Sequence, residues 1–426
     1  MNEIKLRSKL HSLIPGGAHT YSRGDDQFPE NAPVAIIHGK GCEVKGSNGK
    51  TYFDMGMGLR SVSIGHGNRK QNKFIYSKTL NGNNFTRPNL EELFLAEKLN
   101  EVIPCAEMVK FAKNGSDVTT GAVKLARAYT GKRHVLRCAN NPFFSVDDWF
   151  IGDTPMDRGV PSEISSLTSQ FEYGDIEKLF KLRAEIGDDI ACVILEPFGF
   201  ENFDIEYLKA LRAFCTANQI VLIFDEVISG FRYHLKGAQF LAGVTPDLAT
   251  FGKALGNGFP ISALCGKKEI MEIGGIDHIE DRVFLLSTTF GSERSGLAAG
   301  LWTLSQMEKE PYFQGNYEVG GFVKSHFNET ATAYGISNLV QIVGAEINPI
   351  IQCKNEDGKL SGSIRYKLMK HLFDQGLMMP YISISASHRE KFVKEYRIRI
   401  EKALFHFSKD KQIDFPELKP VFRKKN

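Results

Sequence analysis

The chain has 426 residues, of which 42% are hydrophobic and 24% charged, and these values are ordinary for a folded globular protein. A chain of this length can bury a large core and is expected to form about two or three domains. Its formal net charge of +3 gives no case for a nucleic-acid partner, because nucleic-acid-binding proteins usually concentrate basic residues on one face.

The seven cysteines are scattered without paired spacing, so we expect buried thiols of a reducing compartment and neither disulfides nor a metal site. Residues 1–17 are predicted to begin with an amphipathic helix that lacks the apolar core of a signal peptide. No apolar run reaches the length needed to cross a bilayer. The sequence therefore predicts a cytoplasmic protein without a membrane partner.

The N-terminal third contains short elements and loops. A helix is predicted at Lys5–Leu13, followed by a polar, irregular segment at 18–33 that is expected to be a loop of the kind that carries specificity. The segment 34–55 alternates between apolar and polar residues and contains turn residues at 39–40 and 47–49. This pattern predicts a small antiparallel sheet.

From a predicted helix at 90–101 onward, strand-like runs alternate with helices, which predicts a mainly parallel sheet flanked by helices on both faces. The predicted strands are 109–112, 134–138, 191–195, 220–224, 248–251, 262–265 and 284–286. Later elements are strands within 338–352 and helices at 294–307, 363–375 and 388–407.

Two places in this alternating region suit an anionic, nitrogen-containing ligand. After the first strand come Gly115 and Ser116, then a helix, and such a turn directs free backbone N–H groups and the helix dipole at an anion such as a phosphate. The apolar run 219–224 ends in Asp225 and Glu226, and acids at the carboxyl end of a buried parallel strand lie where open α/β sheets bind ligands.

A further candidate ligand site is the segment Thr245–Pro260, where an apolar run is followed by Lys253 in a glycine-rich loop. An amine held in a partly dry pocket loses its proton more easily and can attack a carbonyl to form a Schiff base. The alternative for Lys253 alone is a solvated lysine in a turn. A phosphate cradle, an aspartate and a Schiff-base lysine together describe a pyridoxal phosphate site, in which Asp225 would keep the pyridine nitrogen protonated.

Eight motifs occur in one order across most of the chain: IPGG at 14–17, GKTYFD at 49–54, IGHG at 64–67, GSDVTTGAVKLARAYTG at 115–131, ILEP at 194–197, FDEVISGFR at 224–232, TPDLATFGKALGNGFP at 245–260 and TTFGSERSGLAAG at 288–300. With these motifs the chain resembles the class III, fold type I pyridoxal phosphate aminotransferases, and most closely their glutamate-1-semialdehyde aminomutase branch. The resemblance implies an α/β fold with a large cofactor-binding domain at 76–310. A smaller α+β domain would be built from both termini, 1–75 and 311–426.

The resemblance also assigns residues to the cofactor. Phe143 falls at an aromatic position that stacks on the cofactor ring, with Phe144 at the family's histidine position, and Glu196 falls near the cofactor face. Thr289 matches a threonine that reaches the cofactor phosphate of the neighbouring subunit, which implies a homodimer with shared active sites. The alternatives are that Phe143 and Phe144 are both core residues, that Glu196 is an ordinary acid at a strand end, and that Thr289 supplies only a hydroxyl at a strand end.

Substrate contacts are assigned in the same way. The family's residues that meet the substrate carboxylate fall on Thr20 and Arg23, and an arginine fork suits a carboxylate geometrically. Arg60 would favour an acidic or phosphorylated substrate. The alternatives are that Arg23 is a surface arginine paired with Asp25 or Asp26, and that Arg60 is a structural cation at a dimer interface.

Departures from the aminomutase pattern indicate a different substrate. Leu59 stands where the aminomutase has a tryptophan, Pro380 stands where it has a glutamate, and its aromatic-His-Gly sequence is absent. We therefore expect an intermolecular aminotransferase with glutamate as donor and a keto or aldehyde group of a polar, acidic acceptor, such as a sugar precursor in amino-sugar or surface-polysaccharide biosynthesis. The alternative is glutamate-1-semialdehyde 2,1-aminomutase or a related intramolecular transfer.

Two other classes of protein are disfavoured. A binding or regulatory protein on this scaffold would normally have lost the lysine that stands at 253. A nicotinamide-dependent oxidoreductase would need a glycine fingerprint between its first strand and helix, whereas the glycines at 39–46 lie in a predicted hairpin.

Overall fold

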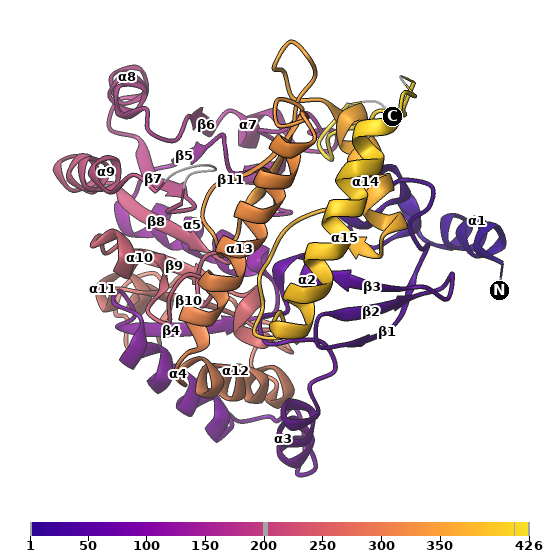
Figure 1. Ribbon diagram of the computed structural model, residues 1–426. Coiled ribbons are helices and arrows are strands. Elements are labelled where there is room, and N and C mark those ends of the chain that lie inside the picture. The colour runs from indigo at the N-terminus through magenta and orange to yellow at the C-terminus, as the bar shows by residue number, and fades with distance from the viewer. Residues whose placement is uncertain (1, 199–202, 413, 425–426) are drawn as a thin grey trace. The chain divides into compact units, whose positions relative to one another are not determined.

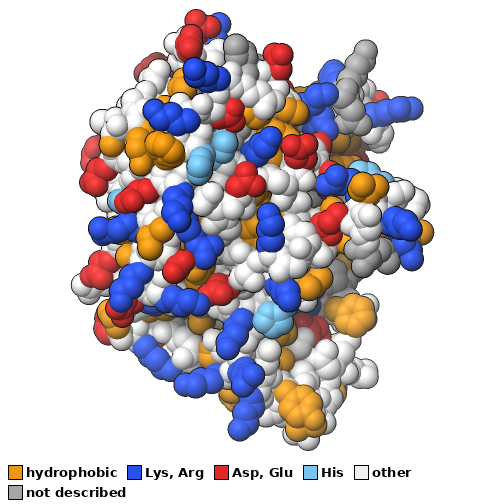
Figure 2. All heavy atoms as spheres, turned by 45° about the vertical axis from the view of Figure 1, so that its right-hand side comes forward, with side chains coloured by type: hydrophobic (Ala, Val, Ile, Leu, Met, Phe, Trp, Pro, Cys, Tyr) orange, Lys and Arg blue, Asp and Glu red, His pale blue; other side chains and the backbone are white. Residues whose placement is uncertain are grey.

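The computed structural model describes residues 2–198, 203–412 and 414–424 (Figure 1). The chain divides into two compact units, one formed by Met1–Asn68 with Gln314–Asn426 and the other by Arg69–Phe313. On the face drawn in Figure 2, lysine and arginine side chains are interspersed with aspartate and glutamate. None of the described helices has the length and apolar character required to span a membrane.

The central unit, Arg69–Phe313, is organised around a seven-stranded sheet in the order β4-β10-β9-β8-β7-β5-β6. Among these strands only β10 runs antiparallel to its neighbours, which confirms the predicted mainly parallel sheet. Strands β5, β7, β8, β9 and β10 are buried along their whole length, as is expected for strands covered on both faces. The bounds are β4 Met108–Ala112, β5 His134–Cys138, β6 Thr168–Phe171, β7 Ile190–Leu195, β8 Val221–Glu226, β9 Leu248–Phe251 and β10 Ser262–Gly266.

Helix α5 (Gly115–Thr130) packs against strands β4, β7, β8, β9 and β10 because one face of it is apolar. Its buried stripe includes Val118, Ala122 and Leu125, and the helix ends at Gly131 in the left-handed conformation that glycine favours. Figure 1 shows α8 (Ile176–Ile186), α9 (Ile205–Ala217) and α10 (Gly237–Ala242) along one side of the sheet. Other helices of this unit are α3 Arg69–Thr79, α4 Leu90–Val102, α6 Asp148–Ile151, α7 Ser162–Ser165, α11 Lys268–Met271 and α12 Arg294–Met307.

The unit built from both termini contains a four-stranded sheet, β1-β2-β3-β13, in which β13 joins β3 in parallel. The predicted antiparallel segment is present, but its first turn lies at Gly41-Cys42 and not at Gly39-Lys40, because Lys40 still pairs with Glu43. The strands are β1 Ile36–Lys40, β2 Glu43–Gly46, β3 Thr51–Asp54 and β13 Leu377–Met378, with a separate hairpin of β11 Val340–Val343 and β12 Ile350–Cys353. The helices are α1 Glu3–Leu13, α2 Met57–Arg60, α14 Gly362–Asp374 and α15 Glu390–Lys409, together with α13 Tyr312–Ala333.

In the central unit one predicted strand is wrong and β6 was not predicted; β13 of the other unit was not predicted either. Residues 284–286 form no strand, and the side chain of Phe284 is 72% exposed. Leu285 in this run is buried, so the apolar run marks a buried side chain, but a run of three residues does not distinguish a strand from a packed loop. Conversely, β6 has the polar sequence Thr-Ser-Gln-Phe and pairs with β5 at the edge of the sheet, where hydrophobic patterning is weak.

We predict that Gly320→Ala destabilises the unit built from both termini. Gly320 in α13 lies against the loop before β12, and an added Cβ would overlap the carbonyl oxygen of Glu346. Forcing this contact apart should lower the free energy of unfolding by about 1–3 kcal/mol, measured by urea denaturation. The control is Gly321→Ala, whose Cβ would lie an ordinary 3.6 Å from Glu346 Cγ. Equal destabilisation of both variants would contradict the proposed close approach.

Candidate active site

Lys253 lies two residues after the end of β9 and begins a short 3₁₀ turn, η4 (Lys253–Gly256). Its φ of 39° and the φ of 45° at Asn257 place both residues in the left-handed region. Gln71 supports this turn, because its amide nitrogen donates to the Gly256 carbonyl at 3.1 Å and its amide oxygen accepts from Asn257 Nδ2 at 2.7 Å. Side-chain-bearing residues are strained in this conformation, and such strain is often found at functional sites.

Asp225, near the end of β8, is buried and has hydrogen bonds on one carboxyl oxygen. Thr250 Oγ1 and the Val227 backbone N–H both donate to Asp225 Oδ1, each at 3.0 Å. Burial raises the pKa of Asp225 above its ordinary value, while the Val227 N–H, the charge of Lys253 and the Thr250 hydroxyl act in the opposite direction. Asp225 and Lys253 are therefore close enough to influence each other electrostatically.

Glu226 has a structural role. Successive side chains of a strand point to opposite faces, so Glu226 points away from Asp225. Its carboxylate accepts hydrogen bonds from the Ala238 N–H at 2.5 Å, the Gln239 N–H at 3.2 Å and the Gln239 side chain at 2.9 Å, which satisfies the first turn of α10. Of the two acids at the end of this strand, Asp225 is the one that lies near Lys253.

Gly115 and Ser116 form the first turn of α5, which is where the sequence predicted a turn able to bind an anion. Asp117 Oδ2 accepts from the Asn114 N–H at 2.9 Å, which fixes the start of the helix. The N–H groups of a helix's first turn have no acceptors within the helix and can bind an anion. Ser116 Oγ accepts from the Val146 N–H at 3.1 Å, so this turn also holds the loop after β5.

Val227 brings the three predicted segments together. Its backbone N–H binds Asp225, and a Cβ added to Gly115 would lie 3.1 Å from Val227 Cγ1. A Cβ added to Gly252, next to Lys253, would lie 3.5 Å from the same methyl group. The first turn of α5, the buried aspartate and the lysine loop therefore meet around one valine residue.

The two phenylalanines after β5 have different environments. Phe144 is 1% exposed and packs between Trp149 and Phe150, whereas Phe143 is 43% exposed and contacts the Phe150 ring edge to face at a centroid distance of 5.7 Å. Thr119 Oγ1 in α5 donates to the Phe144 carbonyl at 2.8 Å, which fixes the loop beside the first turn of α5. The accessible ring is therefore that of Phe143.

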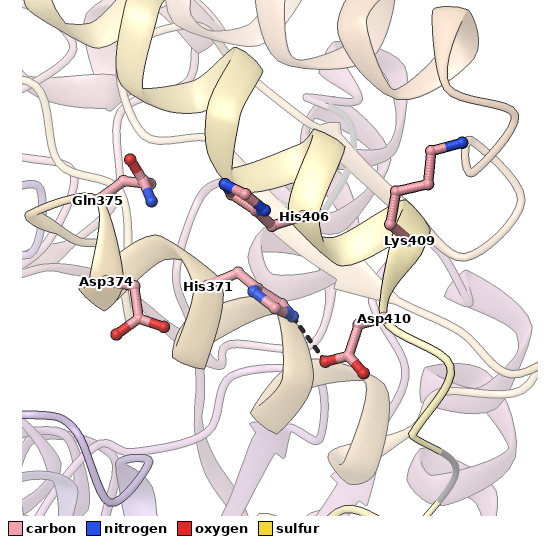
Figure 3. A pocket seen from close by; sticks show the side chains of 6 residues that line it. All are labelled: His371, Asp374, Gln375, His406, Lys409 and Asp410. Carbon is pink, nitrogen blue, oxygen red and sulfur yellow. Dashed lines mark hydrogen bonds and ion pairs between the residues drawn. The ribbon is translucent and has the colours of Figure 1, made fainter.

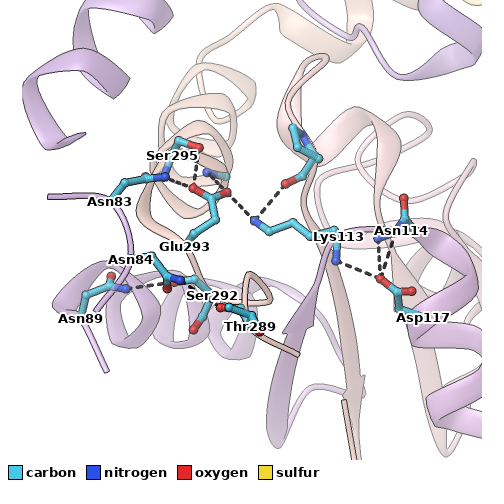
Figure 4. Close-up of polar contacts among 12 residues, drawn as sticks. Asn83, Asn84, Asn89, Lys113, Asn114, Asp117, Thr289, Ser292, Glu293 and Ser295 are labelled. Carbon is cyan, nitrogen blue, oxygen red and sulfur yellow. Dashed lines mark hydrogen bonds and ion pairs between the residues drawn. The ribbon is translucent and has the colours of Figure 1, made fainter. Parts of the chain in front are cut away.

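Glu196 and Thr289 lie on loops at this unit's surface. Glu196 follows β7, is half-buried, and its backbone N–H donates to the buried Asn141 Oδ1 at 3.0 Å. Thr289 is exposed, and its carbonyl accepts from Asn84 Nδ2 at 3.1 Å (Figure 4). Its side chain is thus accessible on a loop whose backbone is fixed.

Thr20, Arg23 and Arg60 belong to the unit built from both termini. Thr20 accepts through its carbonyl from the Arg23 N–H at 2.9 Å. Arg23 is exposed, and its suggested partners have other contacts: Asp25 pairs with Arg7 and His11, and Asp26 pairs with Arg423. Among the described residues Arg23 therefore forms no ion pair with either aspartate.

Arg60 is held firmly within its own unit. Its Nε donates to Asn348 Oδ1 at 2.8 Å, and its guanidinium carbon lies 5.1 Å from the centroid of the Tyr381 ring. It ends a turn, α2, in which Met57, Gly58, Leu59 and Arg60 all have positive φ. This left-handed winding fixes the direction in which the arginine leaves the backbone.

The same unit contains a pocket of about 440 Å³ (Figure 3). It is lined by His371, Asp374, Gln375, His406, Lys409 and Asp410. His371 Nε2 lies 2.9 Å from Asp410 Oδ2, and burial lowers the pKa of His371 below its ordinary value. None of the residues predicted from the sequence lines this pocket. Across the described part of the chain, no group of three or more histidine, cysteine, aspartate or glutamate side chains is arranged to hold a metal ion.

Sequence reasoning missed several residues that shape the site, including Thr250, Val227 and Asn141. Thr250 stands within the motif at 245–260, on a predicted strand. In the structure this strand pairs with the strand of Asp225, and the motif was the signal that could have indicated Thr250. Val227 and Asn141 have no signal in one sequence, because their importance depends on contacts with distant segments.

The sequence model of the family described as Aminotransferase class-III matches residues 25–383. The 3-aminobutyryl-CoA aminotransferase of Cloacimonas acidaminovorans is 32% identical over 386 residues, which cover 89% of this chain and 90% of that protein. The glutamate-1-semialdehyde 2,1-aminomutase of Neisseria gonorrhoeae is 32% identical over 330 residues, covering 74% of this chain and 75% of that protein.

Solved structures show the same fold. An omega-transaminase from Sphaerobacter thermophilus aligns with a TM-score of 0.86 at 23% identity, covering 95% of this chain and 98% of that one. The FumI protein of Sphingopyxis sp. MTA144, solved in its PLP internal aldimine form, also aligns with a TM-score of 0.86 at 23% identity and covers 95% of each chain. The predicted fold class is confirmed.

We predict that Asp225→Asn changes how stability depends on pH. Burial raises the pKa of Asp225, so the folded state binds this proton more tightly than the unfolded state, and the wild-type protein loses stability as pH rises above the ordinary value of 3.8. In cofactor-free protein, urea denaturation at pH 5 and pH 8 should show the wild type losing more stability across this range than Asp225→Asn.

Asp247 provides a control of opposite sign. Hydrogen bonding by Lys267 and Arg212 holds its pKa below the ordinary value despite burial, so its ionised form stabilises the fold. Asp247→Asn should therefore be less stable than the wild type at both pH values. Identical pH profiles for Asp225→Asn and the wild type would contradict the raised pKa.

Proposed function

The chain belongs to the class III aminotransferases, and from this premise we propose that it moves an amino group between two separate small molecules, from an amino acid to a keto or aldehyde acceptor. Its cofactor is pyridoxal 5'-phosphate. The observation that carries the proposal is the convergence of Lys253, Asp225 and the first turn of α5 around Val227.

The side chains present fit this cofactor. The first turn of α5 offers backbone N–H groups to a phosphate, and Asp225 is a buried acid that a protonated ring nitrogen would neutralise. Bound pyridoxal phosphate supplies an aldehyde that condenses with amines and a ring that delocalises the electrons left when a proton is removed from the substrate.

In this proposal Lys253 holds the cofactor through its ε-nitrogen and, once displaced by the donor, takes and returns the proton at the substrate α-carbon. Asp225 holds a proton at the ring nitrogen, with Thr250 and the Val227 N–H fixing its orientation. Phe143 supplies an apolar ring beside the cofactor. Glu196 is proposed to lie near the same face.

We propose that the protein is a homodimer in which Thr289 meets the cofactor phosphate of the partner subunit. Thr289 stands beside exposed apolar side chains: Phe290 follows it in the chain and is 61% exposed, and Phe85, 45% exposed, follows Asn84. Exposed apolar surface of this kind commonly marks a protein interface. A second copy of this chain is the proposed partner.

For the substrate we propose a polar, acidic acceptor, with Thr20 and Arg23 binding its carboxylate and Arg60 contributing positive charge. The support is that Asp25 and Asp26 have other cationic partners and leave Arg23 available for a ligand. A sugar precursor in amino-sugar or surface-polysaccharide biosynthesis is the leading acceptor and glutamate the donor. A cytoplasmic location is proposed with them.

A second candidate is the intramolecular reaction of glutamate-1-semialdehyde 2,1-aminomutase, which relatives of this chain carry in their names. The sequence at the corresponding positions argues against it. Pro380 occupies the position of the aminomutase glutamate, and its carbonyl accepts from Arg365 at 3.0 Å. Proline has no ionisable side chain that could replace that glutamate.

The experiment supplies purified protein with glutamate and a panel of acceptors: keto sugars, β-keto acyl thioesters and glutamate 1-semialdehyde. Formation of 2-oxoglutarate in proportion to an aminated acceptor is the expected result. Isomerisation of glutamate 1-semialdehyde without any 2-oxoglutarate would favour the second candidate. Absence of amino transfer to every member of the panel, by protein that carries cofactor, would contradict the acceptor class.

We predict that Lys253→Ala retains pyridoxal phosphate without a covalent bond and loses turnover by at least about 100-fold, because its proton carrier is gone. Borohydride reduction followed by peptide mapping should label Lys253 in the wild type and no lysine in the variant. Lys268→Ala, at an exposed lysine, is the control and should keep both label and activity. A label at another lysine in the wild type would refute the assignment.

A further inference from the structure

The ammonium group of Lys113 joins three segments of the central unit. Lys113 follows β4 and precedes the first turn of α5 by two residues. Its Nζ forms an ion pair with Glu293 and donates to the Pro260 carbonyl at 3.2 Å (Figure 4). Pro260 ends the segment that carries Lys253, and Glu293 ends the loop that carries Thr289. One cation therefore connects all three.

The ion pair is buried and fully integrated into the fold. The side chains of Lys113 and Glu293 are 17% and 7% exposed. Glu293 also caps α12, because its carboxylate accepts from the Ser295 and Gly296 N–H groups at 2.8 and 2.9 Å and from Ser295 Oγ at 2.5 Å. Since both oxygens are held, the carboxylate can move only together with the start of the helix.

The space around the ammonium requires a glycine. A Cβ added to Gly296 would lie 2.8 Å from Lys113 Nζ and 2.6 Å from the Pro260 carbonyl oxygen. Glycine in the first turn of a helix otherwise weakens it relative to alanine. The absence of a side chain at 296 is what lets the lysine reach both of its partners.

The loop before Glu293 is fixed as well. Asn84 Nδ2 donates to the Thr289 carbonyl at 3.1 Å, and Asn89 Nδ2 donates to the Ser292 carbonyl at 3.0 Å. A Cβ added to Gly291 would lie 3.2 Å from the carbonyl oxygen of Phe111 in β4. The Thr289 loop is thus held against the strand that leads into Lys113.

We propose that Lys113 is a positioning residue for the cofactor phosphate: its ammonium sets the first turn of α5 relative to the Lys253–Pro260 segment and the Thr289 loop. This inference rests on the proposed function. The N–H groups that bind a phosphate act at hydrogen-bond distance, and a shift of about 1 Å is enough to weaken such a site. Lys113 acts through the backbone around it.

The test compares two probes, pyridoxal 5'-phosphate and pyridoxal, which lacks the phosphate, by measuring their dissociation constants with wild type and Lys113→Met. Lys113→Met should weaken pyridoxal phosphate binding by about tenfold or more while changing pyridoxal binding less than about twofold, because the hydrogen bonds to the anion are the ones displaced. A merely structural role would weaken both probes alike, and that result or unchanged binding of both would overturn the proposal.

Further variants distinguish the effect of where the Lys113 ammonium lies from the effect of the charges of Lys113 and Glu293. We call the ratio of the dissociation constants of pyridoxal and pyridoxal phosphate the phosphate preference. Gly296→Ala displaces the ammonium without removing any charge, so it should lower the phosphate preference as Lys113→Met does. The double variant Lys113→Met/Glu293→Gln removes the unpaired carboxylate as well, and the preference should stay low. Restoration of the wild-type preference in the double variant would show that the charge of Glu293, and not the placement by Lys113, was responsible, and would overturn the proposal.

The matched control is Lys98→Met, which breaks another ion pair of the same unit, with Glu101 and Glu308. It should leave the phosphate preference at the wild-type value, and a loss there would overturn the proposal. The proposed function is judged separately, because its failure would appear in the unaltered protein as absence of the borohydride label at Lys253.

Discussion

The constraint on which this structure depends is a buried carboxylic acid, Asp225, that forms no ion pair with any cation among the described residues. Asp225 lies in the middle of a sheet whose strands are covered on both faces, and in the described part of the chain Thr250 and the Val227 N–H donate to its Oδ1. Ionisation of such a group opposes folding. In the proposed site a cationic ring nitrogen bound beside Asp225 would remove that penalty, and cofactor binding would then be thermodynamically linked to the stability of the sheet.

Much of the fold was predictable because its strands are central and its helices amphipathic. Strand β7 appears in the sequence as a short, wholly apolar run, and the buried stripe of α5 follows helical spacing. The failures lie where these signals break down. Residues 284–286 are apolar but form no strand, and Phe284 among them is exposed. Strand β6 is polar but paired, because an edge position needs less apolar surface than a central one.

The sequence indicated which residues belong to the candidate site, but it provided less information about how their side chains are arranged. Asp225 and Glu226 stand together at the end of a strand that is buried on both faces, and hydrophobic patterning cannot tell which face binds a ligand. The structure separates them, since Glu226 caps α10. Lys113 and Glu293 are 180 positions apart, so their ion pair has no counterpart in local spacing. Contacts of this kind depend on how the chain closes in space.

The turn Met57–Arg60 has a consequence for adaptation of the protein to heat. Met57, Leu59 and Arg60 have φ values of 42°, 59° and 66°, a mirror-image winding that costs about 1–2 kcal/mol for each residue with a side chain. Selection for thermal endurance alone would favour glycine at these positions, but glycine at 60 would remove the arginine, and glycine at 57 and 59 would leave a flexible turn that no longer orients it. Endurance and the orientation of this arginine are therefore competing demands on the same three residues.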